Sequence, residues 1–522
     1  MADPITKVYI LDVPLENDYK NTLYFANASA QQSYFQSKVI RSFTDFTYQR
    51  KDKIIRLPVE YDSIYHANYV MYQNSNYSNK WFYAFITELE YINDGLTYAH
   101  IETDVIQTWL FDYNVKSSFV EREHTSDDTI GSNTVPENLE LGEYVVNGLY
   151  KDTSLNDFVY ILHASEKASG QTTDNDRHVN LGGVEAPGVM YVFTNDLSGK
   201  SELVNVLQDY DTNGKGDAII SVYMVPRPII EMPEPNSIRY YGQDDPKYYD
   251  IEFDKPDDLD SYEPRNNKLF TYPYCYLILD NNNGTSNILQ YEEFNKNNDG
   301  KVHFEVSGVP VLGGSIKCIP KYYKNMGANE QEGIICGKFP VCGWVSDLYI
   351  NWLTQNAVNI GVGIASSGLS IIGGIAAIGS GAGAVAGASM VGSGALGIAS
   401  SIGQIYQHKL TPDSARGNTN GGDINTCFNS NTFYFVGMSI KEEYAQIIDG
   451  YFDLYGYKTN RVKIPNKNHR QRWWYTKTIN VNIDGNIPQN DMQKIKNCYD
   501  NGITFWRNAS EIENYSLSNN IV

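Results

Sequence analysis

One stretch of the chain begins like a calcium-binding loop. Asp209, Asp211 and Asn213 place oxygen atoms at alternate positions, and Gly214 permits the sharp turn that such a loop makes. The loop then requires a bidentate Glu six residues after the glycine, where this chain has Ile220. Because the strongest ligand is missing, the sequence favours an Asp- and Asn-rich surface turn over a calcium site.

The remaining reactive residues form no catalytic motif. The eight histidines include no HExxH pair, and the chain has no G-x-S-x-G elbow, Walker loop or dinucleotide glycine fingerprint. Carboxylate pairs such as Glu292-Glu293 are common in so acidic a chain, so they do not distinguish a glycosidase from a solvated surface. We therefore expect no enzyme, no bound metal and no cofactor.

A basic and aromatic stretch lies at Arg461–Trp474 (RVKIPNKNHRQRWW). Its basic side chains, together with Trp473 and Trp474, could hold single-stranded nucleic acid by charge and stacking. The same stretch also fits a subunit contact or an exposed strand pair. We prefer the contact, because a chain with a formal net charge of −21 does not attract a polyanion.

The cysteines are scattered through the sequence without a CxxC pair. In a chain of 522 residues the simplest interpretation is buried thiols, with disulfides or a metal site as alternatives. The start, MADPITKVYI, has no apolar core segment and does not fit a secretory signal, so we expect synthesis in a reducing cytoplasm. The six cysteines are Cys275, Cys318, Cys336, Cys342, Cys427 and Cys498.

The most unusual stretch is Leu348–Gln407, which contains no Asp, Glu, Lys or Arg although 20% of the chain is charged. It is long enough to cross a bilayer about twice, at roughly 20 residues per helical span. A buried helix pair is disfavoured, because each glycine inside a helix costs roughly 0.5–1 kcal/mol. A permanent anchor is also disfavoured, because Gly, Ala and Ser contribute little transfer energy.

A conditional membrane segment fits this composition better. Small residues such as Gly383 and Gly387 let helices approach closely, and aromatic residues at the ends suit the water–lipid interface. Until it inserts, the segment must be hidden from water, for instance inside an oligomeric cavity. The residues expected to act in the membrane are Trp352, Ile360, Ile364, Leu369, Ile371, Ile372, Ile375, Ile378, Gly383, Val385, Gly387, Val391, Leu396, Ile398, Ile402, Ile405 and Tyr406.

Outside this segment, the sequence predicts a mainly β fold with short helices. Strands Trp81–Tyr91 and Leu96–Glu102 are expected to form a hairpin around Asn93-Asp94-Gly95, and Phe43–Tyr48 is expected to pair with Ile54–Val59. Four helices are expected from local capping and stop signals. They are Asn27–Phe35 (capped by Asn27 or Ser29), Val105–Phe111 (capped by Asp104), Lys441–Leu454 (stopped by Gly456) and Asp491–Tyr499 (capped by Asn490).

Short motifs at both ends of the chain identify a family. They are Asn17–Thr22 (NDYKNT), Asn79–Phe85 (NKWFYAF), Thr87–Tyr91 (TELEY), Asp104–Trp109 (DVIQTW), Val120–His124 (VEREH), Tyr272–Cys275 (YPYC), Tyr455–Lys463 (YGYKTNRVK) and Asp500–Thr504 (DNGIT). Together they resemble the distal tail (knob) proteins of small short-tailed phages of Gram-positive bacteria. The region from about 150 to 265 matches poorly.

The resemblance implies a virion protein at the distal end of the tail. It implies a homohexameric β-barrel-like tube, in contact with other tail proteins, through which double-stranded DNA passes without sequence-specific binding. Each apolar loop plugs the tube before ejection and then inserts into the host cytoplasmic membrane as a pore. The alternative is a wall-degrading enzyme or a receptor-binding protein that acts through the region 151–265.

The resulting domain organisation has five parts. The tube domain is expected to occupy three of them, and its strands are expected to continue after an inserted, smaller tip domain. The parts are 1–150 (tube), 151–265 (tip), 266–347 (tube), 348–407 (apolar plug) and 408–522 (tube).

Overall fold

The computed structural model describes residues 6–46, 53–75, 79–169, 178–181, 184–230, 239–240, 247–281, 285–295, 297, 299–310, 315–325, 334–338 and 432–522. The expected membrane-active stretch, Leu348–Gln407, lies outside the described residues with every residue named for it, so its role stays a prediction. Within the described residues, no helix has both the length and the apolar composition of a membrane span.

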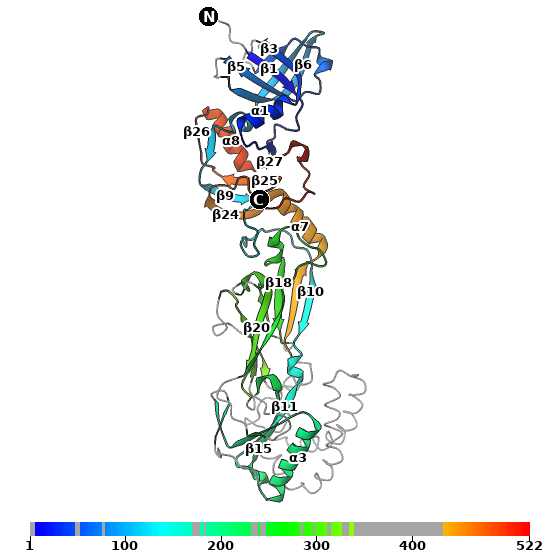
Figure 1. The fold of residues 1–522 in the computed structure, drawn as a ribbon, viewed down its shortest axis with the longest axis vertical. Coiled ribbons are helices and arrows are strands. Elements are labelled where there is room, and N and C mark those ends of the chain that lie inside the picture. The colour runs from blue at the N-terminus through cyan, green and yellow to red at the C-terminus, as the bar shows by residue number, and fades with distance from the viewer. Residues whose placement is uncertain are drawn as a thin grey trace, which may run out of the picture. The chain divides into compact units, whose positions relative to one another are not determined.

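The chain folds into two units, each assembled from separate stretches of sequence (Figure 1). The first contains Met1–Glu143, Ser261–Leu269 and Lys441–Val522; the second contains Tyr144–Asp260 and Phe270–Ile440. The short stretch Ser261–Leu269, called the crossing segment below, therefore belongs to the first unit although residues of the second unit flank it. The five expected parts divide the chain more finely than this, and their boundaries stay a prediction.

A six-stranded antiparallel sheet opens the first unit. Its strand order is β3 (Val39–Phe46), β1 (Thr6–Leu11), β5 (Tyr69–Asn74), β6 (Trp81–Asn93), β7 (Leu96–Thr103) and β4 (Ile54–Leu57). The sequence of β5 explains its inner position, because both of its faces are apolar. Val70 and Tyr72 enter one buried cluster, whereas Tyr69 and Met71 enter another on the opposite face.

The hairpin prediction is confirmed, and the neighbouring strand pair is wrong. β6 ends at Asn93 and β7 begins at Leu96, so Asp94 and Gly95 form the two-residue turn. Among the described residues, β3 pairs with β1 and β4 pairs with β7, at opposite ends of the strand order. The reason is that strands pair so that their apolar side chains reach the buried face of the sheet. Strands that are neighbours in sequence therefore need not pair.

Three of the four expected helix signals are confirmed. α1 (Ala28–Gln36) is capped by Asn27, α2 (Val105–Trp109) is capped by Asp104, and α7 (Glu442–Tyr455) stops at Gly456. The cap expected at Asn490 is wrong, because α8 (Gln489–Asn501) already includes that residue. Pro488 occupies the cap position instead, and its fixed φ lets the helix begin immediately after it.

A second sheet of the first unit joins residues from both ends of the chain. Its order is β2 (Asn21–Leu23), β27 (Ile503–Trp506), β25 (Trp473–Ile479), β9 (Ser118–Glu123) and β24 (Tyr457–Lys463). β2 and β27 are parallel, whereas the other pairs are antiparallel. Beside this sheet, β8 (Tyr113–Val115) pairs with β26 (Ile483–Gly485).

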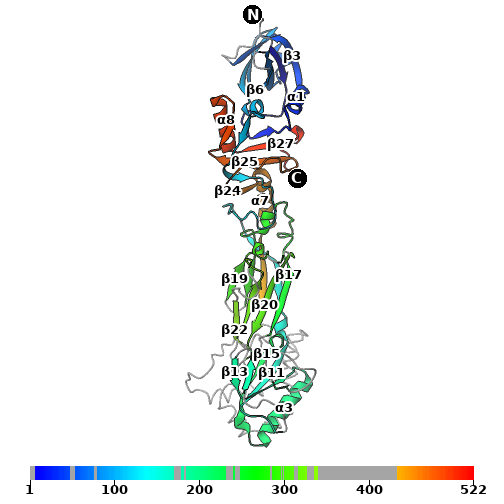
Figure 2. The same ribbon diagram turned by 60° about the vertical axis from the view of Figure 1, so that its left-hand side comes forward.

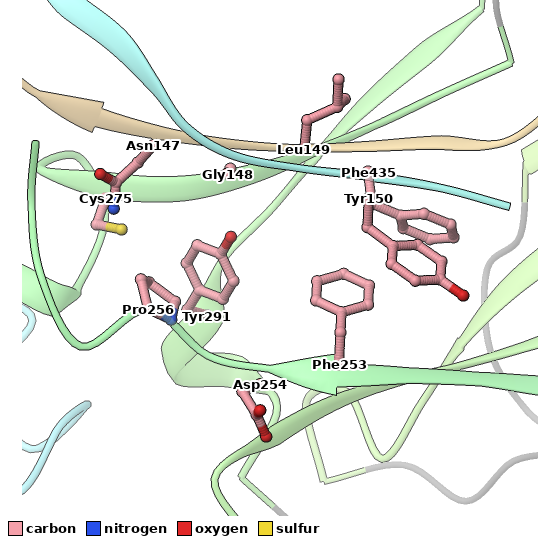
Figure 3. A pocket seen from close by; sticks show the side chains of 11 residues that line it. Asn147, Gly148, Leu149, Tyr150, Phe253, Asp254, Pro256, Cys275, Tyr291 and Phe435 are labelled. Carbon is pink, nitrogen blue, oxygen red and sulfur yellow. The ribbon is translucent and has the colours of Figure 1, made fainter.

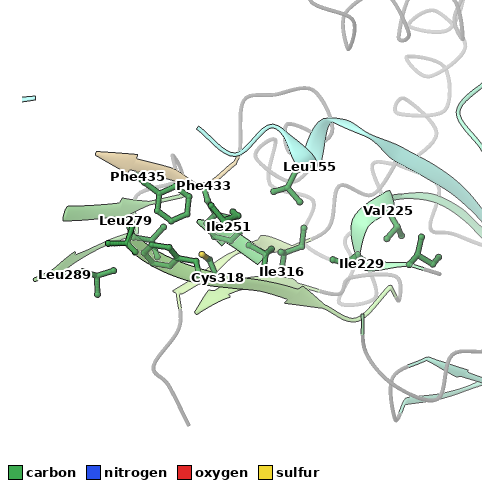
Figure 4. Close-up of a cluster of buried hydrophobic side chains, with 14 of the residues drawn as sticks. Leu155, Val225, Ile229, Ile251, Leu279, Leu289, Ile316, Cys318, Phe433 and Phe435 are labelled. Carbon is green, nitrogen blue, oxygen red and sulfur yellow. The ribbon is translucent and has the colours of Figure 1, made fainter. Parts of the chain in front are cut away.

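The second unit contains two four-stranded antiparallel sheets that share an apolar core (Figure 4). In β20, alternate residues point inward, so Val302, Phe304 and Val306 are buried while their neighbours are partly exposed. One sheet has the order β10 (Tyr144–Lys151), β23 (Tyr434–Ile440), β18 (Cys275–Asp280) and β19 (Ser286–Leu289). The other has the order β17 (Tyr248–Asp254), β20 (Lys301–Gly308), β21 (Ser315–Lys321) and β22 (Ile334–Lys338).

The sequence predicted that strands of 266–347 continue the N-terminal sheet. Within the described residues, they do not join it. β18 pairs with β23 and β19, and β20 pairs with β17 and β21, all inside the second unit. Turn-rich sequence shows where strands begin and end, but it carries no signal for the sheet that each strand joins.

The second unit contains a further four-stranded sheet, whose strands β11 and β15 are labelled in Figure 2. The side chains of its two faces enter two different buried clusters. Its order is β15 (Ile219–Pro226), β11 (Phe158–Ala164), β14 (Val189–Phe193) and β16 (Arg239–Tyr240), beside the pair β12 (His178–Leu181) and β13 (Val184–Pro187). α3 (Leu197–Thr212) covers one face through Leu203, Val206 and Tyr210. The opposite face adds Val159 and Ile161 to the core that the other two sheets share.

Candidate functional site

The calcium-like stretch lies at the end of α3, so it has no loop geometry. Asp209 and Asp211 are in the last turn of the helix, and Asn213 is its C-cap. The Asp209 carboxylate accepts hydrogen bonds from Ser169 N (2.6 Å) and Asn213 Nδ2 (2.9 Å). Within the described part of the chain, no group of three or more His, Cys, Asp or Glu side chains is placed to hold a metal ion.

The two tryptophans of the basic stretch are core residues, which corrects the expectation that they stack on nucleic acid or form a contact. Trp473 packs against Trp506, with ring centroids 5.0 Å apart, and its Nε1 donates to Asp453 O (2.8 Å). Trp474 stacks on Phe505 at 5.6 Å, and both tryptophans are buried. Both tryptophans lie in β25 and are buried on its two faces, and Arg470 of the same stretch is buried as well.

A cavity of about 260 Å³ opens beside the edge strand β10 in the second unit (Figure 3). Aromatic side chains line much of it: Phe253 lies between Tyr150 (5.2 Å between ring centroids) and Phe435 (5.4 Å). Gly437 also lines the cavity, and a Cβ there would lie 2.9 Å from the Tyr291 hydroxyl. The lining of this cavity is therefore mostly apolar and aromatic.

The reactive groups around this cavity are unsuited to catalysis. Burial raises the pKa of the Cys275 thiol to about 12, so the thiol stays protonated and is a poor nucleophile. The pKa of Tyr291 is raised for the same reason. Glu292 is buried nearby, accepts a hydrogen bond from Tyr272 N (3.0 Å) and has a pKa raised by burial. Cys275, Cys318 and Cys498 are buried, as the sequence predicted for them.

In the first unit, a buried charge cluster holds β9 to the crossing segment. Glu137 forms ion pairs with both Arg122 and Lys268, and all three side chains are almost fully buried. Arg122 also donates to Gly456 O (2.6 Å), and Lys268 donates to Val135 O (2.8 Å). Burial lowers the pKa of Lys268, although the charge of Glu137 opposes that shift. We did not predict this cluster from the sequence. The consecutive charges of VEREH are a signal that could have indicated it, because neighbouring residues of a strand point to opposite faces.

A second set of polar contacts ties the crossing segment to α7. Asp449 is buried and accepts hydrogen bonds from Tyr262 Oη (2.7 Å), Arg265 N (2.8 Å) and Asn266 Nδ2 (2.8 Å). Asp453, one turn later, forms an ion pair with Arg265, and burial raises the pKa of Asp453 to about 6. Asp449 and Asp453 both bind residues of the crossing segment, so these contacts hold that segment against α7.

The neutral side chain of His124 links β25 to α7. Its Nδ1 accepts a hydrogen bond from Tyr475 N (2.8 Å), and its Nε2 lies 3.1 Å from Asp453 O. Burial lowers the pKa of His124 to about 3, and the charge of Arg470 acts in the same direction. A histidine that stays neutral and has both nitrogens engaged acts as a structural connector.

The ion pairs and hydrogen bonds of Glu137, Asp449 and His124 hold strands and segments of the first unit together, and comparison with known proteins shows its family. The model of the C-terminal domain of tail knob protein gp9 of Bacillus phage phi29 matches residues 241–520, more than half of the chain. The chain belongs to the phage tail knob protein family. The N-terminal model of the caudoviral major tail proteins also matches, over residues 5–114.

Full-length relatives of the tail knob family extend this match over nearly the entire chain. The tail knob proteins gp9 of Bacillus phages PZA and phi29 are each 29% identical to it, over 99% of this chain and 98% of theirs. The gp9 protein of Bacillus phage B103 is 28% identical, over 98% of this chain and 97% of its own. The resemblance inferred from the motifs is confirmed.

A solved tail knob structure shows the same fold. The structure of tail knob protein gp12 of bacteriophage C1 aligns with a TM-score of 0.64 at 14% identity, over 99% of this chain and 100% of that chain. The mainly β fold with few short helices is thus confirmed. As a member of the tail knob family, the protein is a component of the virion tail at its distal end, in contact with other tail proteins.

Proposed function

We propose that this tail knob protein assembles as a homohexameric tube through which the phage genome leaves the virion. In this proposal, Leu348–Gln407 of each subunit plugs the tube, then leaves it and forms a pore in the host cytoplasmic membrane. The observation that carries the proposal is the charge-free stretch itself, within a chain that is otherwise polar and belongs to the tail knob family.

The composition of the stretch suits both states that the proposal requires. Its length allows about two helical spans of roughly 20 residues each. Its many small residues keep its hydrophobicity low, so it can wait inside a protein cavity without aggregating. The acidic surface of the chain, with a net charge of −21, suits a tube that lets a polyanion pass without holding it.

Leakage of dye from liposomes tests the pore. We expect the full chain to release dye, at acidic or at neutral pH, and the deletion of Ala357–Ile405 to release none. Two substitutions test the chemistry of the stretch: I371D/I375D puts charges in the membrane and abolishes leakage, whereas the matched change S367A preserves it. Equal leakage from the deletion variant and the full chain would refute the pore.

We also propose that the protein acts without catalysis. The described residues of 151–265 include a sheet covered by α3, and Asp209 near the end of that helix accepts hydrogen bonds from Ser169 N and Asn213 Nδ2. Incubation of the purified chain with host cell walls tests this, with release of neither sugars nor peptides as the expected result. Adsorption of the chain to cells, with and without competing wall polymer, tests the receptor-binding alternative.

A further inference from the structure

The second sheet of the first unit exposes a row of apolar side chains across three adjacent strands. Val462 of β24 lies opposite Phe119 of β9, and Phe119 lies opposite Ile479 of β25. Val462 is 72% exposed, Ile479 is 48% exposed and Phe119 is half-buried. Ile464, just after β24, is 59% exposed. β24 is the edge strand of this sheet, so the row ends where backbone groups are also open to a partner.

Basic side chains gather at the same edge. Lys458, Arg461 and Lys463 line a polar cavity of about 140 Å³ beside β24. A bulge brings them together: the register shifts between Lys458 and Arg461, and Asn460 within the bulge has a φ of 47°. The bulge thus places three basic side chains close together on a chain whose net charge is strongly negative.

These three cations differ in their ion-pair partners among the residues that the structure describes. Lys463 pairs with Glu123 at 2.5 Å. Among the described residues, by contrast, no carboxylate forms an ion pair with the side chain of Lys458 or Arg461, and Arg461 is exposed. Asp127, the other carboxylate that lines the cavity, accepts hydrogen bonds from Thr129 N (2.9 Å) and from a serine hydroxyl. Three cations, Lys458, Arg461 and Lys463, line this cavity with two carboxylates, Glu123 and Asp127, so the edge presents net positive charge beside an apolar row.

The hairpin of β6 and β7 presents the opposite combination. Near its turn, Tyr91 is 56% exposed and Ile92 is 36% exposed. Glu88 and Glu90 are exposed on the same strand. Apart from His100, 3.3 Å from Glu90, no cation among the described residues pairs with these two carboxylates. The end of the hairpin is thus both apolar and negatively charged.

We propose that the β24 edge of one copy binds the β6–β7 hairpin of the next copy. Copies of a chain with a net charge of −21 repel one another unless a cationic surface meets an acidic one, and these two surfaces supply that match. The contact joins two different surfaces, so repetition of it produces a ring or a filament, and ring closure gives a closed oligomer. This inference rests on the proposed function, because it assigns surfaces to the subunit contact that the hexamer requires.

Charge reversal in the full chain tests the contact. We expect R461E and E90R each to raise the dissociation constant of the oligomer at least about tenfold at low salt, and the double variant R461E/E90R to recover most of that loss. K317E changes the charge equally at an exposed position of the second unit and should leave assembly unchanged. V462S tests the apolar row without a change of charge. Circular dichroism and the thermal transition confirm that each variant is folded.

The outcomes separate this inference from the proposed hexamer. Wild-type protein that is oligomeric, with R461E, E90R and V462S assembling as well as it does, overturns the contact and leaves the hexamer standing. Wild-type protein that stays monomeric at every concentration overturns the hexamer as well. Loss of assembly in single variants, with rescue in the double variant, supports the contact.

Cross-linking identifies the occupant of the surface. In the variant Y91C/V462C, a short bismaleimide should produce a ladder of covalent oligomers, because each copy offers one reactive thiol to each neighbour. Each single variant should give no species larger than a dimer, and the wild-type chain controls for its own cysteines. A cross-link confined within one chain would overturn the inference, since the hairpin or another segment of the same copy would then cover β24.

Discussion

The Tyr69 hydroxyl donates a hydrogen bond of 2.8 Å to the Asp104 carboxylate. Asp104 also accepts a hydrogen bond from Gln107 N (3.0 Å) and so caps α2. Tyr69 belongs to β5, so one buried carboxylate both begins a helix and anchors that helix to the central part of a sheet. Burial raises the pKa of Asp104 to about 6, with the two hydrogen bonds acting in the opposite direction.

This pKa predicts a dependence of stability on pH. An unfolded Asp has a pKa of about 3.9, so between roughly pH 4 and pH 6 the folded state binds more protons than the unfolded state. The free energy of unfolding should therefore fall as pH rises through this window. Asp453 acts in the same direction, because burial raises its pKa to about 6 too.

Substitution of Asp104 separates its charge from its cap. D104N keeps an oxygen that accepts from Gln107 N, so we expect folded protein whose stability falls less between pH 4.5 and pH 7.5 than that of the wild type. D104A loses the cap and should cost about 0.5–2 kcal/mol at every pH. Urea unfolding followed by circular dichroism measures both, and a wild-type pH dependence in D104N would refute the argument.

Removal of Glu137 should be severe. E137Q leaves Arg122 and Lys268 buried without a negative partner, and breaking such a buried pair costs about 3–5 kcal/mol. The matched control is E143Q, which breaks the exposed ion pair with Lys441 and should leave the midpoint of thermal unfolding unchanged. Equal effects of the two substitutions would show that burial of the Glu137 cluster has no energetic importance.

Substitution by alanine should change the stability of the protein in opposite directions at Gly450, inside α7, and at Gly456, its C-cap. Gly456 has a φ of 63°, and a Cβ there would lie 2.2 Å from Glu123 O, so G456A should destabilise the protein by about 1–3 kcal/mol. Gly450 lies inside α7 with open space around its Cβ position, so G450A should stabilise it by about 0.5–1 kcal/mol. Urea unfolding curves measure the change in the free energy of unfolding for each variant. Stabilisation by G456A would contradict the geometry at Gly456.

The Trp474 ring should matter for folding and have no role in binding nucleic acid. W474A removes a buried ring that stacks on Phe505 and should cost about 3–5 kcal/mol, whereas W474F keeps an aromatic ring and should cost less. Affinity for single-stranded DNA, measured on folded W474F, should equal that of the wild type. A clear loss of affinity would restore the nucleic-acid hypothesis.

The correct sequence predictions depended on local signals. Asn27 and Asp104 cap helices through contacts within three residues, and Asp94-Gly95 closes a hairpin between adjacent strands. Those interactions depend on short-range geometry that the residue types already determine. Local chemistry also identified Gly456 as a helix stop, because few other residues adopt a positive φ there.

The errors concerned contacts between distant residues. Trp473 and Trp474 follow a basic run that suggests an exposed surface, yet β25 pairs with β9 and β27, and both tryptophans are buried on its two faces. The Glu137 cluster joins Arg122 to Lys268 across more than a hundred residues, and the charges in VEREH alone do not identify the partners. The row of Val462, Phe119 and Ile479 likewise exists only through strand register.

The pairing of β2 with β27 has a consequence for the synthesis of the protein. Asn21 lies beside Thr504, and the Trp506 indole donates to Asn21 Oδ1 (2.8 Å), so the first strand of this sheet waits for residues made almost five hundred positions later. A nascent chain cannot complete its N-terminal unit while the ribosome still holds residues 503–506. A prematurely terminated chain that lacks them leaves β2 without this partner, so we expect interrupted translation products to fold incompletely.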